Sequence, residues 1–323
     1  MKKIFTLLAL TISFSMNAQV STNSTSPTGT YASAMGNGTT ASGNESTAMG
    51  YDTTASGEAS TAMGYSTTAS TQASIAMGRG TTASGFNSTA IGYNTTASGS
   101  YSTAMGRYTT ASGYASSAMG NSTTASGIYS TAIGVGLTAS GLASTAMGYI
   151  TTASDYASLV IGQYNSSGSS ATSADLFSTS NTAFVIGNGT AFNAKSDAFK
   201  VMFNGDATVS NDLTVSGDVV ISSDARLKSN IVSLGSTLPK LLQIDGKSYE
   251  MKGKQKIGVL AQEIQEVFPE LVSEDDNEML AVNYQGLVPV LINALKEQQG
   301  EINRLKDQEK RLERLEKLVA QLD

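Results

Sequence analysis

The residues best suited to chemistry in this 323-residue chain lie in one short run, the S-D-A-R-L-K segment of residues 223–228. The chain contains no His and no Cys, which excludes thiol nucleophiles, disulfides, Cys/His zinc sites and Ser-His-Asp catalysis. A serine paired with a lysine, or a pair of carboxylates, is the chemistry that is left. Lys228 can act as a general base for Ser223 when desolvation favours its neutral amine. On these residues alone, a polar loop that leads into a domain is the simpler interpretation.

Charged residues are distributed unevenly along the chain. Residues 31–162 carry two basic side chains, Arg79 and Arg107, and four acidic ones, whereas residues 223–323 carry 14 Lys and Arg and 17 Asp and Glu. This contrast predicts a domain boundary near residue 220. The net charge of −6 argues against a nucleic-acid-binding protein. Because hydrophobic residues reach 40%, the chain can still bury a core.

The first eighteen residues have the features of a secretory signal. Two lysines follow Met1, residues 4–14 are mostly apolar, and Ala18 is a small residue at the expected cleavage point. A short membrane anchor is the alternative, but the apolar stretch is well below the roughly 20 residues of a spanning helix. We therefore expect a protein that is secreted or displayed at the cell surface after cleavage near Ala18.

Residues 19–162 contain a repeat with a period of fourteen. Gly follows Met or Ile at positions 36, 50, 64, 78, 92, 106, 120, 134, 148 and 162. The unit reads T-A-S-G-x-x-S-T-A-M-G-x-x-T, which is poor in helix-forming residues. Two strands of about four or five residues with two tight turns would use about fourteen residues. Each unit is thus expected to form one coil of a narrow β-solenoid.

Strand alternation predicts which side chains face the inside of each coil. Ser46, Ala48 and Gly50 share one face, and Thr47 and Met49 share the other. A narrow coil has room only for the small face, so the Met and Ile residues would form an outer apolar stripe. Burial against the stripes of sister chains would remove this stripe from water. The alternative is that Met and Ile fill the core of the coil itself.

The repeat resembles the YadA-like head of trimeric autotransporter adhesins over residues 30–162. The S-x-A-[MI]-G signature carries the resemblance because it recurs ten times in register. The resemblance implies a left-handed parallel β-roll that assembles as a homotrimer. Thr71 and Asp155 replace the turn glycine of their units, and we expect both to be tolerated loop variants.

Residues 163–222 are expected to form a β-rich connector. Short alternating runs at 183–187, 199–203 and 213–215 are separated by Gly, Asn-Gly and Gly-Asp turn signals. The segment 213–221 resembles the trimeric β-stalk that precedes fibre end domains.

The S-D-x-R-L-K motif resembles the start of the intramolecular chaperone domain of phage tail spikes, the chaperone of endosialidase or peptidase S74 family. The segments 257–272 and 281–291 resemble two further motifs of that family, so the resemblance covers residues 223–299, a small α+β domain. It implies that Ser223 is the nucleophile, that Lys228 is its base, and that Asp224 and Arg226 shape the loop. The domain would align three chains and then cut its own backbone once, at Ser222-Ser223.

Residues 287–322 have the spacing of a long helix, and residues 300–323 the spacing of a coiled coil. Leu305, Leu312 and Val319 occupy one heptad position, and Leu315 and Leu322 occupy another. A short parallel trimeric coiled coil is expected; the alternative is one amphipathic helix docked on its own domain.

Together these features favour a secreted trimeric fibre that cuts off its own chaperone and needs no metal or cofactor. Its expected partners are two sister chains and an unidentified surface ligand, without nucleic acid and without a transmembrane segment. The alternatives are a fibre that is not cleaved, a phage-tail-fibre-like receptor-binding protein and, more remotely, an ice-binding solenoid. Against ice binding, neighbouring residues such as Thr53 and Thr54 must face opposite ways in a strand.

Overall fold

The computed structural model describes residues 22–168, 170–274 and 278–321. The predicted signal at residues 1–18 lies outside these ranges. The chain divides into two compact units, Met1–Gly217 and Asp218–Asp323, called here the N-terminal and the C-terminal unit.

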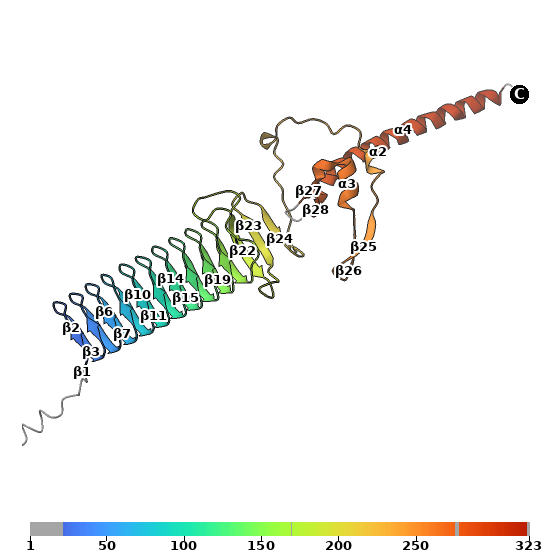
Figure 1. Ribbon diagram of the computed structural model, residues 1–323. Helices are drawn as coiled ribbons and strands as arrows, with labels where there is room; N and C mark the ends of the chain where they lie inside the picture. Colours follow the sequence, from blue (N-terminus) through green and yellow to red (C-terminus); the bar gives the residue numbers. More distant parts are fainter. Residues whose placement is uncertain (1–21, 169, 275–277, 322–323) are drawn as a thin grey trace, which may run out of the picture. The chain divides into compact units, whose positions relative to one another are not determined.

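The N-terminal unit is a stack of parallel coils (Figure 1), and each regular coil contributes a five-residue and a two-residue strand. The stack begins with β1 (Thr22–Asn23) and β2 (Ser26–Pro27). The longer strands are β3 (Ser33–Asn37), β5 (Thr47–Tyr51), β7 (Thr61–Tyr65), β9 (Ile75–Arg79), β11 (Thr89–Tyr93), β13 (Thr103–Arg107), β15 (Ser117–Asn121), β17 (Thr131–Val135), β19 (Thr145–Tyr149) and β21 (Leu159–Gln163). The shorter strands are β4 (Thr40–Ala41), β6 (Thr54–Ala55), β8 (Thr68–Ala69), β10 (Thr82–Ala83), β12 (Thr96–Ala97), β14 (Thr110–Ala111), β16 (Thr124–Ala125), β18 (Thr138–Ala139) and β20 (Thr152–Ala153).

Identical positions of successive coils stand opposite each other, fourteen residues apart. Met49 pairs with Met63 and Thr54 with Thr68, so the longer strands form one parallel sheet and the shorter strands another. The β-solenoid that the repeat predicted is confirmed. Its coils stack in register because every unit presents the same residues to the next.

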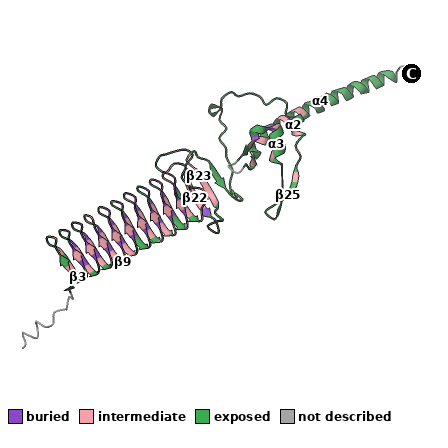
Figure 2. Ribbon diagram, viewed as in Figure 1, coloured by how far each residue is buried: buried purple, intermediate pink, exposed green. Residues whose placement is uncertain are grey.

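Small side chains fill the interior of the solenoid, as predicted. Ala48 and Ser46 are fully buried, whereas Met49 on the opposite face is only partly buried, and Figure 2 shows buried positions recurring along the coils. The alternative in which Met and Ile fill the coil core is therefore wrong. The threonine pairs alternate as expected: Thr53 is buried and Thr54 is half-buried, so the pairs do not form an outer array two threonines wide.

The glycine after each Met or Ile has a steric reason. Gly106 has a φ of +122°, a conformation that L side chains rarely adopt, and a Cβ there would overlap the carbonyl oxygen of Gly120 in the next coil. The strict fourteen-residue spacing of this glycine is therefore a condition for stacking.

The two fourteen-residue repeats that lack the turn glycine differ from each other. The Thr71 hydroxyl donates a hydrogen bond of 2.6 Å to the Gly85 carbonyl oxygen of the next coil. Asp155 is fully buried, and its carboxylate accepts hydrogen bonds from the backbone amides of Thr172 (2.6 Å) and Thr182 (2.8 Å). The expectation that Asp155 is merely a tolerated loop variant is wrong, because it ties the last coil to the connector.

The connector extends the sheet of longer strands. β22 (Thr182–Asn188) pairs parallel to β21, and β23 (Asp197–Met202) and β24 (Ala207–Val209) follow in antiparallel order. Residues 210–224 form neither a strand nor a helix in the single chain. The β-stalk expected over 213–221 thus stays a prediction for the assembled protein.

The C-terminal unit has mixed α and β structure around a small core. Its elements are η1 (Ala225–Leu227), α2 (Leu238–Leu241), β25 (Lys247–Met251), β26 (Lys254–Gly258), α3 (Ala261–Val267), η2 (Pro269–Leu271), β27 (Val272–Glu274), β28 (Leu280–Val282), η3 (Tyr284–Gly286) and α4 (Leu287–Val319). The buried core consists of Ile264, Phe268, Leu271 and Val290, so α3, η2 and the start of α4 pack against one another. The Glu297 carboxylate of α4 accepts a hydrogen bond of 2.6 Å from the Thr237 amide at the start of α2.

The two halves of α4 have different surroundings. Val290 and Ala294 are buried, but Leu305, Leu312 and Leu315 are each more than half exposed. The alternative in which residues 300–319 dock on their own domain is therefore wrong, and the last heptad residue, Leu322, lies outside the described residues. No helix among the described residues is long and apolar enough to cross a membrane.

Candidate active site

The S-D-A-R-L-K run folds into a single tight turn. The Asp224 carboxylate caps η1 by accepting a hydrogen bond of 2.9 Å from the Arg226 amide. The Arg226 guanidinium also donates to this carboxylate, at 2.7 Å for its shortest contact. These hydrogen bonds lower the pKa of Asp224 and raise that of Arg226. The backbone then turns back, because the Lys228 amide donates to the Ala225 carbonyl oxygen at 3.1 Å.

This turn brings the two predicted chemical groups together. The Lys228 Nζ donates a hydrogen bond of 2.7 Å to the Ser223 Oγ. Both residues are exposed in the single chain. Asp224 and Arg226 form a surface ion pair beside them, which shapes the turn but adds little to global stability. The arrangement has the contact that a Ser-Lys pair requires, without the burial that a lysine base requires.

A cavity of about 530 Å³ in the C-terminal unit has this pair in its wall. One part of the wall comes from the segment before the pair and another from η3 and the start of α4. The lining residues are Val219, Ile221, Ser222, Ser223, Lys228, Asn283, Gln285, Gly286, Val288 and Pro289. The bond between Ser222 and Ser223 therefore lies at a cavity that has apolar and amide side chains in its wall.

Asn283 and Gln285 were not predicted as site residues. The Asn283 side chain caps η3 by accepting a hydrogen bond of 3.1 Å from the Gly286 amide. The backbone amide of Asn283 donates to the Leu271 carbonyl oxygen at 2.8 Å. The signal was present in the segment 281–291, but its spacing does not say that it lies opposite a turn about 60 residues earlier.

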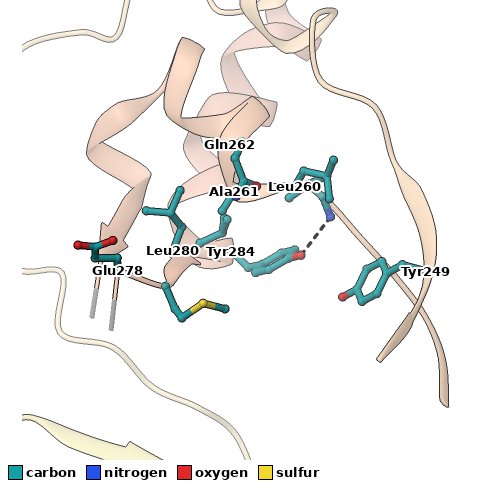
Figure 3. A pocket seen from close by; sticks show the side chains of 10 residues that line it. Tyr249, Leu260, Ala261, Gln262, Glu278, Leu280 and Tyr284 are labelled. Atoms are coloured by element: carbon teal, nitrogen blue, oxygen red, sulfur yellow. Dashed lines mark hydrogen bonds between the residues drawn. The ribbon is translucent and has the colours of Figure 1, made fainter. Parts of the chain in front are cut away.

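Figure 3 shows a second cavity, of about 330 Å³, in the C-terminal unit. Tyr249, Leu260, Leu280 and Tyr284 line it, and the Tyr284 hydroxyl accepts a hydrogen bond of 3.2 Å from the Val259 amide. Ser223 and Lys228 are not among its lining residues. Because Tyr284 belongs to η3, this contact holds the wall of the Ser223 cavity against the start of α3.

The described residues contain no group of three or more Asp, Glu, His or Cys side chains placed to hold a metal ion. The polar side chains in the wall of the Ser223 cavity are two hydroxyls, one amine and two side-chain amides.

Comparison with protein-family models identifies both parts of the chain. The model of the YadA head domain repeat matches residues 28–53, 55–81, 83–109, 111–136 and 139–165. The chaperone of endosialidase model, of the peptidase S74 family, matches residues 223–273. No curated protein matches the chain. The chain thus carries YadA head repeats followed by a chaperone-of-endosialidase domain, in the order that the sequence predicted.

Proposed function

We propose that this chain is the subunit of a secreted trimeric fibre whose C-terminal unit aligns three chains and then cuts itself off at Ser223. The observation that carries the proposal is the 2.7 Å contact between Lys228 and Ser223, at the start of the chaperone-of-endosialidase match. The fibre itself is the stack of YadA head repeats. One cut per chain is expected, with no external substrate.

The cut is a transfer of one acyl group followed by hydrolysis. The neutral Lys228 amine takes the Ser223 hydroxyl proton while Oγ attacks the carbonyl carbon of Ser222. The Ser222–Ser223 amide bond breaks, its nitrogen takes a proton and becomes the new amino terminus, and an ester joins the two residues. Water then hydrolyses the ester, which frees the carboxyl group of Ser222 and restores the hydroxyl of Ser223.

Three features of the chain support assembly before cleavage. The outer stripe that includes Met105 and Met147 exposes about two fifths of these side chains in the single chain. Leu305, Leu312 and Leu315 of α4 are each more than half exposed in the single chain. In-register stacking of near-identical coils is prone to register slips, so a separate domain that aligns the chains first has a physical advantage.

The experiment is expression of residues 19–323 followed by intact and native mass measurement. Wild type should give a trimer and a released fragment of about 100 residues that starts at Ser223. Ser223→Ala, Lys228→Ala and Lys228→Arg should each remain uncut and still trimerise, since a guanidinium does not deprotonate in proteins. The matched control, Ser229→Ala, should be cut like wild type.

The same masses decide between the alternatives. An uncut wild-type trimer would leave the C-terminal unit as a plain trimerisation domain. Cleavage of Ser223→Ala at the wild-type rate would show that another protease makes the cut. A fragment that starts at residue 224 would place the broken bond after Ser223, and the acyl transfer from Ser222 to the Ser223 Oγ would then be wrong.

A further inference from the structure

One corner of the solenoid carries a column of tyrosine and arginine side chains. Tyr51, Tyr65, Arg79, Tyr93 and Arg107 are the last residues of five successive longer strands, and each pairs in register with the next. We call this set the Tyr-Arg column. The Tyr51 and Tyr65 rings are stacked at 5.0 Å between centroids. The remaining neighbours are in cation–π contact.

The two arginines are held by rings rather than by acids. The Arg79 guanidinium lies 5.3 Å from the Tyr65 ring and 5.6 Å from the Tyr93 ring. Arg107 lies 5.9 Å from Tyr93 and 4.9 Å from the ring of Tyr108, whose pKa its hydrogen bond lowers. Within the described part of the chain neither guanidinium forms an ion pair. Both side chains are exposed, so their charges are available to a ligand.

The spacing of the arginines selects a type of ligand. They lie two coils apart with Tyr93 between them, which is about 9.6 Å at the usual distance between strands. This is close to the length of one disaccharide in a linear polysaccharide. Guanidinium groups bind carboxylates through paired hydrogen bonds, and the half-buried Tyr93 ring between the two arginines leaves part of its surface open to a sugar ring.

Pairing with acids of a sister chain explains the column less well. Arg79 and Arg107 are the only basic residues between positions 31 and 162. Glu45 and Glu58 are at the opposite corner of the coil but in successive coils, so they do not match the two-coil spacing of the arginines. The Ser66 hydroxyl donates a hydrogen bond of 3.4 Å to the Asp52 carboxylate, so this acid already has a partner in its own chain.

We propose that the Tyr-Arg column binds a linear acidic polysaccharide, with carboxylates of alternate sugars on Arg79 and Arg107 and the intervening sugar against Tyr93. The inference rests on the proposed function only in taking the fibre to be exposed outside the cell. The column lies within one chain, so binding does not depend on whether the C-terminal unit is cut off.

The test is isothermal titration calorimetry of residues 19–323 with two polymers. One is hyaluronan, which carries one carboxylate per disaccharide, and the other is neutral hydroxyethyl cellulose. Wild type should bind hyaluronan and not the neutral polymer, and binding should weaken at high salt. The double variant Arg79→Gln/Arg107→Gln should bind about tenfold more weakly or not at all. Arg79→Lys/Arg107→Lys should fall between the two, because a lysine keeps the charge but not the paired hydrogen bonds.

The matched control is Lys195→Gln, which removes an exposed cation stacked on Phe192 at 5.4 Å in the same unit. It should bind like wild type. The proposal is overturned if wild type does not bind hyaluronan, if the neutral polymer binds equally, or if the double glutamine variant binds as tightly as wild type. It is also overturned if native mass shows that this variant no longer assembles, because the column would then be an interface between copies.

Discussion

Asp155→Gly restores the turn glycine of the repeat, yet it should weaken the junction between the last coil and the connector. The buried carboxylate accepts two backbone amide hydrogens, those of Thr172 and Thr182. Hydrogen bonds to a charged group contribute about 1.5–3 kcal/mol each, so their joint loss corresponds to about 3–6 kcal/mol. The amide of Thr182, which is a buried residue, would also be left without its acceptor.

Hydrogen–deuterium exchange of peptides that contain Thr172 and Thr182 measures this effect directly. A loss of about 3–6 kcal/mol makes local opening roughly two to four orders of magnitude more frequent. Thr71→Gly is the matched control, because it also restores the turn glycine but removes one neutral hydrogen bond, to Gly85, that is worth about 1 kcal/mol. Equal exchange at Thr172 and Thr182 in the two variants would refute the anchoring role of Asp155.

Further predictions concern stacking, pH and assembly. Gly106→Ala should block assembly of soluble coils, measured by far-UV circular dichroism, because its Cβ would overlap the Gly120 carbonyl oxygen. Hydrogen bonds from the Thr237 amide and its neighbours lower the pKa of Glu297, so the C-terminal unit should lose stability as pH falls through that lowered pKa. The contribution is fully present above the unfolded pKa of about 4.3, and Glu297→Gln should reduce the pH dependence of the unfolding midpoint. Leu312→Asp should abolish the trimer in native mass spectra if α4 forms a coiled coil.

The repeat was predictable because one coil contains nearly everything that determines it. Ser46, Ala48 and Met49 are placed on opposite faces by strand alternation alone, and their neighbours are copies of themselves. Asp155 was misjudged for the converse reason. Its partners, Thr172 and Thr182, belong to an irregular connector whose path no local pattern specifies.

The candidate site divides in the same way. The contact between Ser223 and Lys228 forms within six residues, through a cap by Asp224 and one turn of η1, so a short motif suffices to predict it. Asn283 and Gln285 enter the same cavity from η3, far along the chain. Their position depends on how η2, β28 and α4 pack around Leu271, which periodicity does not reveal.

The exposure of the Ser223–Lys228 pair gives a physical reason for the order of assembly and cleavage. In the single chain Lys228 is exposed and its Nζ donates to the Ser223 Oγ, whereas a general base must accept the hydroxyl proton. Covering the cavity with sister chains would remove water and favour the neutral amine. Under the proposed mechanism, a single chain is therefore inactive and a correctly aligned trimer becomes active. Cleavage in dilute monomer as fast as in trimer, measured by intact mass across a concentration series, would contradict this coupling.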